Sequence, residues 1–213
     1  MNKKIIWVFG ESATGKLTLI NNLYYGDKST LDKFNMNNLK IAVCDITLED
    51  RNRDYGTFVD NNIYDDSNME NSDYYFDRDK AIKRRSCVMY DTENFIKSDN
   101  DILFIKGQTD DLIPEKGNIL YYFLNKYSNM DNVDIEVYFL YVSDPEELKR
   151  RIATKPWFIN RTDTEVKLKL LESTPYKQEI QKAKLLEVFN KYGIPMYQIE
   201  SLINDYRNDG IIS

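Results

Sequence analysis

Short apolar runs alternate with longer stretches of mixed polarity along this chain of 213 residues. The apolar runs predict strands at residues 4–9, 39–44, 101–105, 135–142 and 196–199. The stretches between them predict helices at residues 16–25, 79–97, 116–127, 145–153 and 164–191. This alternation predicts a single α/β domain over residues 1–213: a doubly wound, mostly parallel, five-stranded sheet with helices on both faces.

The carboxyl ends of parallel strands are where open α/β sheets bind ligands. Residues 10–18, Asp45 and residues 106–111 each follow one of the predicted strands. We therefore expect these three segments to lie along one edge of the sheet, where their polar groups would share a ligand.

Residues 10–18, which read GESATGKLT, join the first predicted strand to the first predicted helix. Gly10 and Gly15 permit loop angles that a Cβ would resist, and backbone N–H groups at a helix N-terminus attract phosphate. Lys16 is spaced to reach the β- and γ-phosphates of a nucleoside triphosphate. The expected ATP-binding residues are Gly10, Ser12, Ala13, Thr14, Gly15, Lys16, Leu17 and Thr18. The alternative is an ordinary strand-to-helix turn with an incidental lysine.

Leu17 departs from the usual pattern, in which a hydroxyl residue follows the lysine and contacts the metal. A leucine does not ligate Mg²⁺, so the metal would depend on water, phosphates and a carboxylate from elsewhere. The order G-K-x-T, with Thr18 one position later, resembles the loops of adenylate-kinase-like and other nucleoside monophosphate kinases. That resemblance implies that Thr18 lies beside the donor phosphates and the metal.

Carboxylates at the strand ends are the other candidates for holding Mg²⁺, namely Asp45 and Asp110. Asp45 also resembles the general base of hydroxyl-directed kinases, which takes a proton from an attacking hydroxyl; alternatively, it caps the next turn. Related kinases usually have an acidic residue at the end of the third strand, where this chain has Lys106. Lys106 either faces an acceptor phosphate or caps the sheet.

Arginines that are candidates for binding phosphate lie in two regions. Arg84 and Arg85, on the predicted helix 79–97, either bind an acceptor phosphate or form an exposed face. The helix 145–153 ends in Arg150 and Arg151, and Arg161 follows in a segment, about 153–163, that resembles the lid of nucleotide kinases. The resemblance implies that Arg151 and Arg161 close on the phosphates and exclude water. The alternative is a solvated helix end that complements the helix dipole.

Taken together, the loop, the lid-like segment and the order of elements resemble the P-loop kinase superfamily, in its nucleotide-kinase-like group. The resemblance implies an ATP- and Mg²⁺-dependent phosphotransferase that moves the γ-phosphoryl to a nucleotide-like acceptor. One alternative is a hydroxyl-directed kinase acting on nucleic acid or a small metabolite, with Asp45 as base. Another is an ATP-binding switch or ATPase without transfer. The acceptor half, at about 46–100, matches no family pattern.

Composition narrows these choices. The net charge of −6 disfavours broad nucleic-acid binding, and the lack of histidine removes histidine-based catalysis and metal binding. Cys44 and Cys87 are far apart, match no metal or redox spacing, and are expected to be reduced core thiols. With neither a secretory signal nor a membrane span, a cytoplasmic protein is expected. The acidic segment 60–77 is either a solvated, partly disordered loop or a flap that stacks on a base.

Overall fold

The computed structural model describes residues 2–44, 78–107, 119–203 and 205–212, with the backbone alone for residues 78–85 and Trp157. Six strands are described: β1 (Lys3–Phe9), β2 (Ile41–Cys44), β3 (Ile102–Lys106), β4 (Val133–Tyr141), β5 (Met196–Leu202) and β6 (Asp205–Ile212). The described helices are α1 (Lys16–Tyr24), α2 (Lys28–Phe34), α3 (Arg78–Lys97), α4 (Ile119–Tyr127), α5 (Pro145–Ala153), α6 (Pro156–Ile159) and α7 (Thr164–Lys191). The predicted α/β class is confirmed.

The strands form one sheet in the order β2-β3-β1-β4-β5-β6. Neighbouring strands are parallel except β6, which runs antiparallel to β5. The prediction of five strands was therefore wrong, because it missed β6. Among the β6 side chains only Tyr206 is buried, so this edge strand lacks the alternating apolar pattern by which a strand is found in a sequence. The short helices α2 and α6 were missed as well, and α6 lies inside the predicted lid segment.

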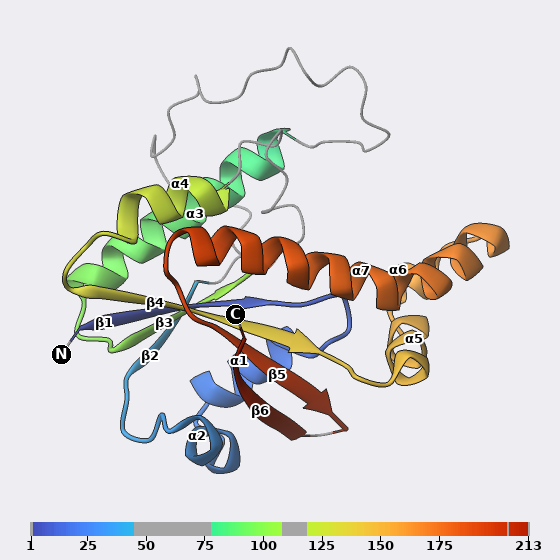
Figure 1. The fold of residues 1–213 in the computed structure, drawn as a ribbon, viewed down its shortest axis with the longest axis horizontal. Helices are drawn as coiled ribbons and strands as arrows, with labels where there is room; N and C mark the ends of the chain where they lie inside the picture. The colour runs from blue at the N-terminus through green and yellow to red at the C-terminus, as the bar shows by residue number, and fades with distance from the viewer. Residues whose placement is uncertain (1, 45–77, 108–118, 204, 213) are drawn as a thin grey trace.

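Both faces of the sheet are covered by helices, as Figure 1 shows. Ile6 and Val8 of β1 pack with α1 and α2 on one face. Ile5, Trp7 and Phe9 pack with α3, α4 and α7 on the other face. All five side chains are fully buried. Because successive residues of a strand point to opposite faces, a strand covered on both sides appears in the sequence as one continuous apolar run.

The position of β1 determines where a ligand would bind. After β1 the chain passes to α1 on one face. The helix α4, which follows β3, and the long helix α7, which follows β4 after α5 and α6, lie on the other face. The carboxyl end of β1 is therefore a point at which the connections switch faces. In open α/β sheets, ligands bind at such points. The loop at residues 10–15 begins there.

The α5 and α6 helices are joined to this loop by a small apolar cluster. Its buried members are Val142, Leu148, Ile152 and Phe158, and partly buried Ala13, Ala153 and Leu171 pack against them. Because Ala13 belongs to the loop, the segment that resembles a lid lies next to it. Over the described parts of the chain, no helix combines the length and the apolar character needed to cross a membrane.

Candidate phosphate-binding site

The two glycines of the loop are required by its backbone. Gly10 and Gly15 have φ values of 141° and 84°, in the range that L side chains rarely adopt. A Cβ on Gly10 would lie 2.3 Å from the carbonyl oxygen of Leu140, too close for any side chain. Gly15 is the N-cap residue of α1 and has no side chain with which to cap the first amides of that helix. These amides are therefore available to an anion or to water.

The Lys16 side chain folds back across the loop. Its ammonium group donates hydrogen bonds to the carbonyl oxygens of Gly10, at 2.5 Å, and Glu11, at 2.9 Å. The pKa of Lys16 falls to about 8, mainly because burial disfavours the charged form, and also because Lys106 and Lys155 are close by; the Glu11 carboxylate raises it. Lys16, Lys106 and Lys155 form a local concentration of positive charge, which we call the lysine cluster.

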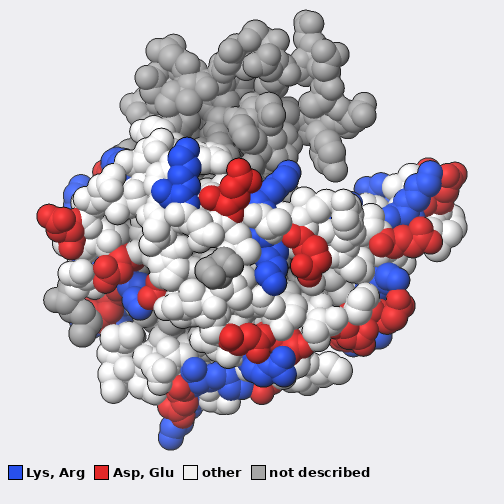
Figure 2. Space-filling view, in the orientation of Figure 1, with Lys and Arg blue, Asp and Glu red and all other residues white. Residues whose placement is uncertain are grey.

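The positions of Lys106 and Lys155 explain the cluster. Lys106 is the last residue of β3 and lies in register with Val8 of β1, so both strands end at the same edge. The expectation that Lys106 and residues 10–18 share an edge is therefore confirmed. Lys155 is the N-cap residue of α6. Lys155 was not among the residues predicted to bind phosphate, although its position inside the lid-like segment could have indicated it. On the face seen in Figure 2, acidic and basic side chains are interspersed.

Glu11 already provides an anionic oxygen to this loop. The backbone N–H of Ser12 donates a hydrogen bond to the Glu11 Oε1 atom at 2.8 Å. The Thr14 hydroxyl donates to the Glu11 carbonyl at 2.8 Å and so holds the turn closed. The loop amide of Ser12 thus binds a carboxylate oxygen where a phosphate oxygen is expected. This role of Glu11 has no signal in the sequence, because its position in the motif accepts any residue.

Thr18 lies in the first turn of α1 with an exposed side chain, next to Leu17, which is 42% exposed. The Thr18 side chain interacts with the phenol of Tyr206. Burial raises the pKa of Tyr206 to about 12, and the contact with Thr18 and the charge of Arg151 oppose that rise. Thr18 offers a hydroxyl oxygen that suits Mg²⁺, and Leu17 does not. A magnesium ion here would therefore need phosphate and water oxygens besides Thr18.

The start of α5 is held by two contacts that the sequence signals in part. Asp144 caps the helix by accepting a hydrogen bond from the Glu146 N–H at 2.9 Å, and Pro145 follows at the first helical position. Gln178 of α7 binds the Val142 backbone twice, accepting from its N–H at 3.0 Å and donating to its carbonyl at 3.2 Å. These contacts orient α5 and therefore its arginines.

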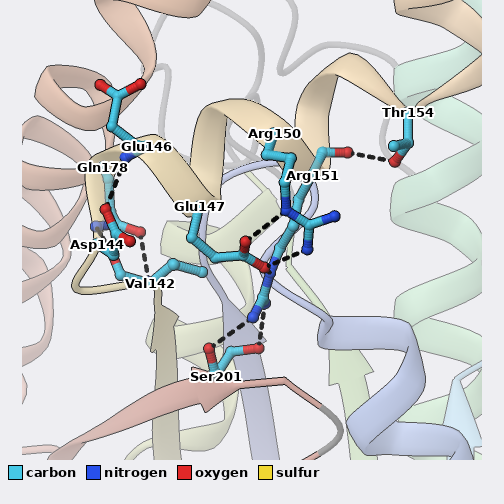
Figure 3. A network of polar contacts seen from close by, with 9 residues as sticks. All are labelled: Val142, Asp144, Glu146, Glu147, Arg150, Arg151, Thr154, Gln178 and Ser201. Carbon is cyan, nitrogen blue, oxygen red and sulfur yellow. Dashed lines mark hydrogen bonds and ion pairs between the residues drawn. The ribbon is translucent and has the colours of Figure 1, made fainter.

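Arg151 extends from α5 to β5, as Figure 3 shows. Its Nε donates to Glu147 at 2.7 Å, and its two terminal nitrogens donate to the Ser201 Oγ at 2.8 Å and the Ser201 carbonyl at 3.1 Å. Arg150 also binds Glu147, and the two guanidinium groups lower the pKa of Glu147 to about 2. A Cβ on Gly15 would lie 3.2 Å from the Ser201 Oγ. Ser201, which anchors Arg151, therefore lies directly beside the loop.

The remaining predicted residues are not brought to the loop by the described contacts. Arg161 is exposed between α6 and α7, and its backbone N–H donates to the Phe158 carbonyl at 3.2 Å. Arg84 and Arg85 lie on α3, within the stretch described by its backbone alone. Asp45 and Asp110 lie outside the described residues, as does the acidic segment 60–77. Their assigned roles stay predictions.

No protein-family model matches the chain, and no curated protein matches it. The function is therefore inferred from the loop, the lysine cluster and the arginine on α5.

Proposed function

We propose that this protein binds a nucleoside triphosphate with Mg²⁺ at residues 10–18 and transfers its γ-phosphoryl group to a nucleotide-like acceptor. One observation carries the proposal: the Lys16 ammonium lies within the loop, on the Gly10 and Glu11 carbonyls, at the carboxyl end of the strand where the connections switch faces. ATP is the donor by default. The resemblance to the P-loop kinases supports the same reading.

The loop supports donor binding through its backbone and its lysines. The first amides of α1, together with the Ser12 amide after Glu11 moves away, would donate to phosphate oxygens. Lys16 would exchange two carbonyl partners for the β- and γ-phosphates, which are stronger acceptors because they are charged. Lys106 and Lys155 would add positive charge where the transferring phosphoryl develops negative charge. Magnesium, held in part by Thr18, would neutralise phosphate charge and orient the γ-phosphoryl.

Arg151 is the best placed arginine to assist transfer. It is anchored to Ser201, which lies against Gly15, and it is largely buried. To reach a phosphate, its guanidinium would give up one of its contacts with Glu147 or Ser201. A planar guanidinium with several donors suits this exchange, because it keeps one partner while it binds another.

A second candidate is a nucleotide-binding switch or ATPase that transfers nothing. Two observations favour it: Leu17 occupies the position of the metal-binding hydroxyl, and the Arg151 guanidinium is held by Glu147 of α5 and Ser201 of β5. The hydroxyl-directed kinase depends on Asp45, outside the described residues. An Asp45→Asn variant separates it from the first candidate: transfer is lost with donor binding retained only if a hydroxyl is the acceptor.

The deciding experiment is a transfer assay with γ-labelled ATP over nucleoside monophosphates, nucleosides, and DNA or RNA 5′ ends. We expect the label on one acceptor class, a loss of about 10²-fold or more in Lys16→Ala, and no change in Lys28→Ala, an exposed lysine on α2. Equal triphosphate binding and turnover in Lys16→Ala would contradict the site. Slow hydrolysis without transfer to any acceptor would favour the switch.

A further inference from the structure

Two cysteines that are far apart in the sequence meet in the fold. Cys44 is the last residue of β2, and Cys87 lies on α3. Their thiol sulfurs and a carboxylate oxygen of Asp91, also on α3, all lie within 4.8 Å of one another. Cys44 and Cys87 are 1% and 3% exposed, and Asp91 is half-buried. Both thiols were expected in the core and are buried there, and the fold makes them neighbours.

The α3 helix presents two of these three groups at a fixed spacing. Cys87 and Asp91 are four residues apart, so they lie on the same face one turn apart. The Cys87 Sγ lies 3.7 Å from the Asp91 Oδ2 atom. A tetrahedral zinc ion, with Zn–S of about 2.3 Å and Zn–O of about 2.0 Å, separates a sulfur from an oxygen ligand by roughly 3.5 Å. This pair therefore already has nearly the separation that a shared metal ion requires.

We propose that Cys44, Cys87 and Asp91 form a binding site for a thiophilic divalent cation, for which Zn²⁺ is the best match. Two sulfurs and one carboxylate oxygen suit Zn²⁺, whereas Mg²⁺ and Ca²⁺ require oxygen ligands. On binding, each thiol gives up its proton to solvent, and the two thiolates with the carboxylate surround the cation. A water molecule on the half-buried Asp91 side would complete four-fold coordination.

The carboxylate is the reason to favour a cation over a disulfide. A disulfide between Cys44 and Cys87 would need only the two sulfurs, and Asp91 would contribute nothing to it. A cation uses all three groups, and the negative charge of Asp91 helps to balance it. The site would join β2 to α3, the two elements that precede and follow residues 45–77. None of its residues belongs to the phosphate loop, so it is independent of the function proposed above.

The test uses the full chain, reduced and stripped of metal with a chelator, and titrated with Co²⁺. We expect one equivalent to bind with a sulfur-to-cobalt charge-transfer band and the visible bands of a tetrahedral ion. Zn²⁺ should displace Co²⁺ and raise the melting temperature, because a ligand that binds only the folded state stabilises it. Cys44→Ser and Cys87→Ser should each remove about half of the charge-transfer intensity or more, because one of the two thiolates is lost, and Asp91→Asn should weaken binding about tenfold or more.

Glu93→Gln is the matched control, because Glu93 lies on the same helix, pairs with Lys126, and should leave cobalt binding unchanged. Lys16→Ala should also leave it unchanged. Where a cysteine variant does not fold, Asp91→Asn decides, since it replaces one half-buried oxygen by nitrogen. Cobalt binding without the charge-transfer band, or with equal affinity in Asp91→Asn, would overturn the proposal. So would a protein that is lighter by two hydrogens as purified and that binds no Co²⁺ after reduction, because that result identifies a disulfide pair.

Discussion

The Tyr206 phenol donates a hydrogen bond to the carbonyl oxygen of Gly15, at 3.1 Å. The same carbonyl accepts the Leu19 N–H at 2.9 Å, which is the first hydrogen bond of α1. Tyr206 belongs to β6, the antiparallel edge strand, so the last strand of the sheet supports the end of the loop at residues 10–15. This contact brings together residues from nearly opposite ends of the chain.

Removal of the Tyr206 hydroxyl tests this support. Tyr206→Phe should lower the free energy of unfolding by about 1 kcal/mol, because the Gly15 carbonyl loses one buried partner. Triphosphate affinity should fall about threefold, since the end of the loop is held less firmly. Urea denaturation and titration with a fluorescent ATP analogue measure the two effects. Tyr24→Phe, at a half-exposed site on α1, is the control and should change neither; equal losses in both variants would rule out a specific role.

Glu11 should compete with phosphate for the loop. Because its carboxylate accepts the Ser12 N–H and lies near Lys16, it has to leave before a phosphate oxygen binds that amide. Glu11→Gln removes the charge and should tighten Mg·ATP binding about fivefold, which corresponds to about 1 kcal/mol. Calorimetric titration measures the dissociation constant. Glu146→Gln, an exposed change on α5, should have no effect; weaker binding in Glu11→Gln would show that the carboxylate assists the ligand.

The lowered pKa of Lys16 predicts a pH dependence of binding. Phosphate binds the ammonium form, which the free protein loses as the pH rises through about 8. Triphosphate affinity should therefore fall by up to about tenfold per pH unit above that value, with a proton taken up on binding. Folding stability should change in the opposite direction. Between about 8 and the ordinary pKa of 10.5, the unfolded chain holds the Lys16 proton more tightly, so stability rises with pH.

Lys16→Arg is the control for this pH dependence, because a guanidinium stays charged throughout the range. Its triphosphate affinity should be flat where that of the parent protein falls. Binding measured by fluorescence at a series of pH values, in buffers of matched ionic strength, makes the comparison. The same decline in both proteins would assign the effect to another group.

The two neighbouring arginines of α5 differ in burial and in partners, so one serves as the control for the other. Arg151 is 16% exposed and binds Glu147 and Ser201, whereas Arg150 is 64% exposed and binds Glu147 alone. Arg151→Ala should lower the free energy of unfolding by about 1–2 kcal/mol, because the Ser201 carbonyl and hydroxyl lose their partner. Arg150→Ala should cost less than about 0.5 kcal/mol. Urea denaturation compares them.

Arg151 also tests the proposed transfer step. If its guanidinium stabilises the transferring phosphoryl, kcat in Arg151→Ala should fall at least about tenfold with the triphosphate dissociation constant nearly unchanged. Arg151→Lys should restore little, since an ammonium does not bridge two oxygens in one plane. An unchanged kcat, together with the loss of stability, would leave Arg151 with a purely structural role.

Local signals explain why much of the fold was predictable. The bounds of α5 and α7 match the predicted residues 145–153 and 164–191, and Asp144 and Asp163 cap the starts of the two helices through their side chains. The apolar run of β1 and the two glycines after it likewise act over a few residues. Hence the strand, the loop and the Lys16 position were found without tertiary contacts.

Contacts between distant residues explain what was missed. β6 was not found because an exposed edge strand buries only Tyr206, and its pairing with β5 comes from the backbone. The role of Arg151 was predicted only as a lid arginine, since nothing in the sequence pairs it with Ser201. Cys44 and Cys87 have no informative spacing; they meet because β2 and α3 pack together.

The sequence by itself determined the order of the first five strands and of the longer helices, together with the loop that suits phosphate, since propensity, capping and glycine conformation depend on neighbouring residues. The tertiary structure alone decided which charges surround Lys16, which residues support Gly15, and which thiols face Asp91. These are contacts between side chains from separate helices, strands and loops. They follow from the strand order and the packing of helices on each face of the sheet, which no local pattern encodes.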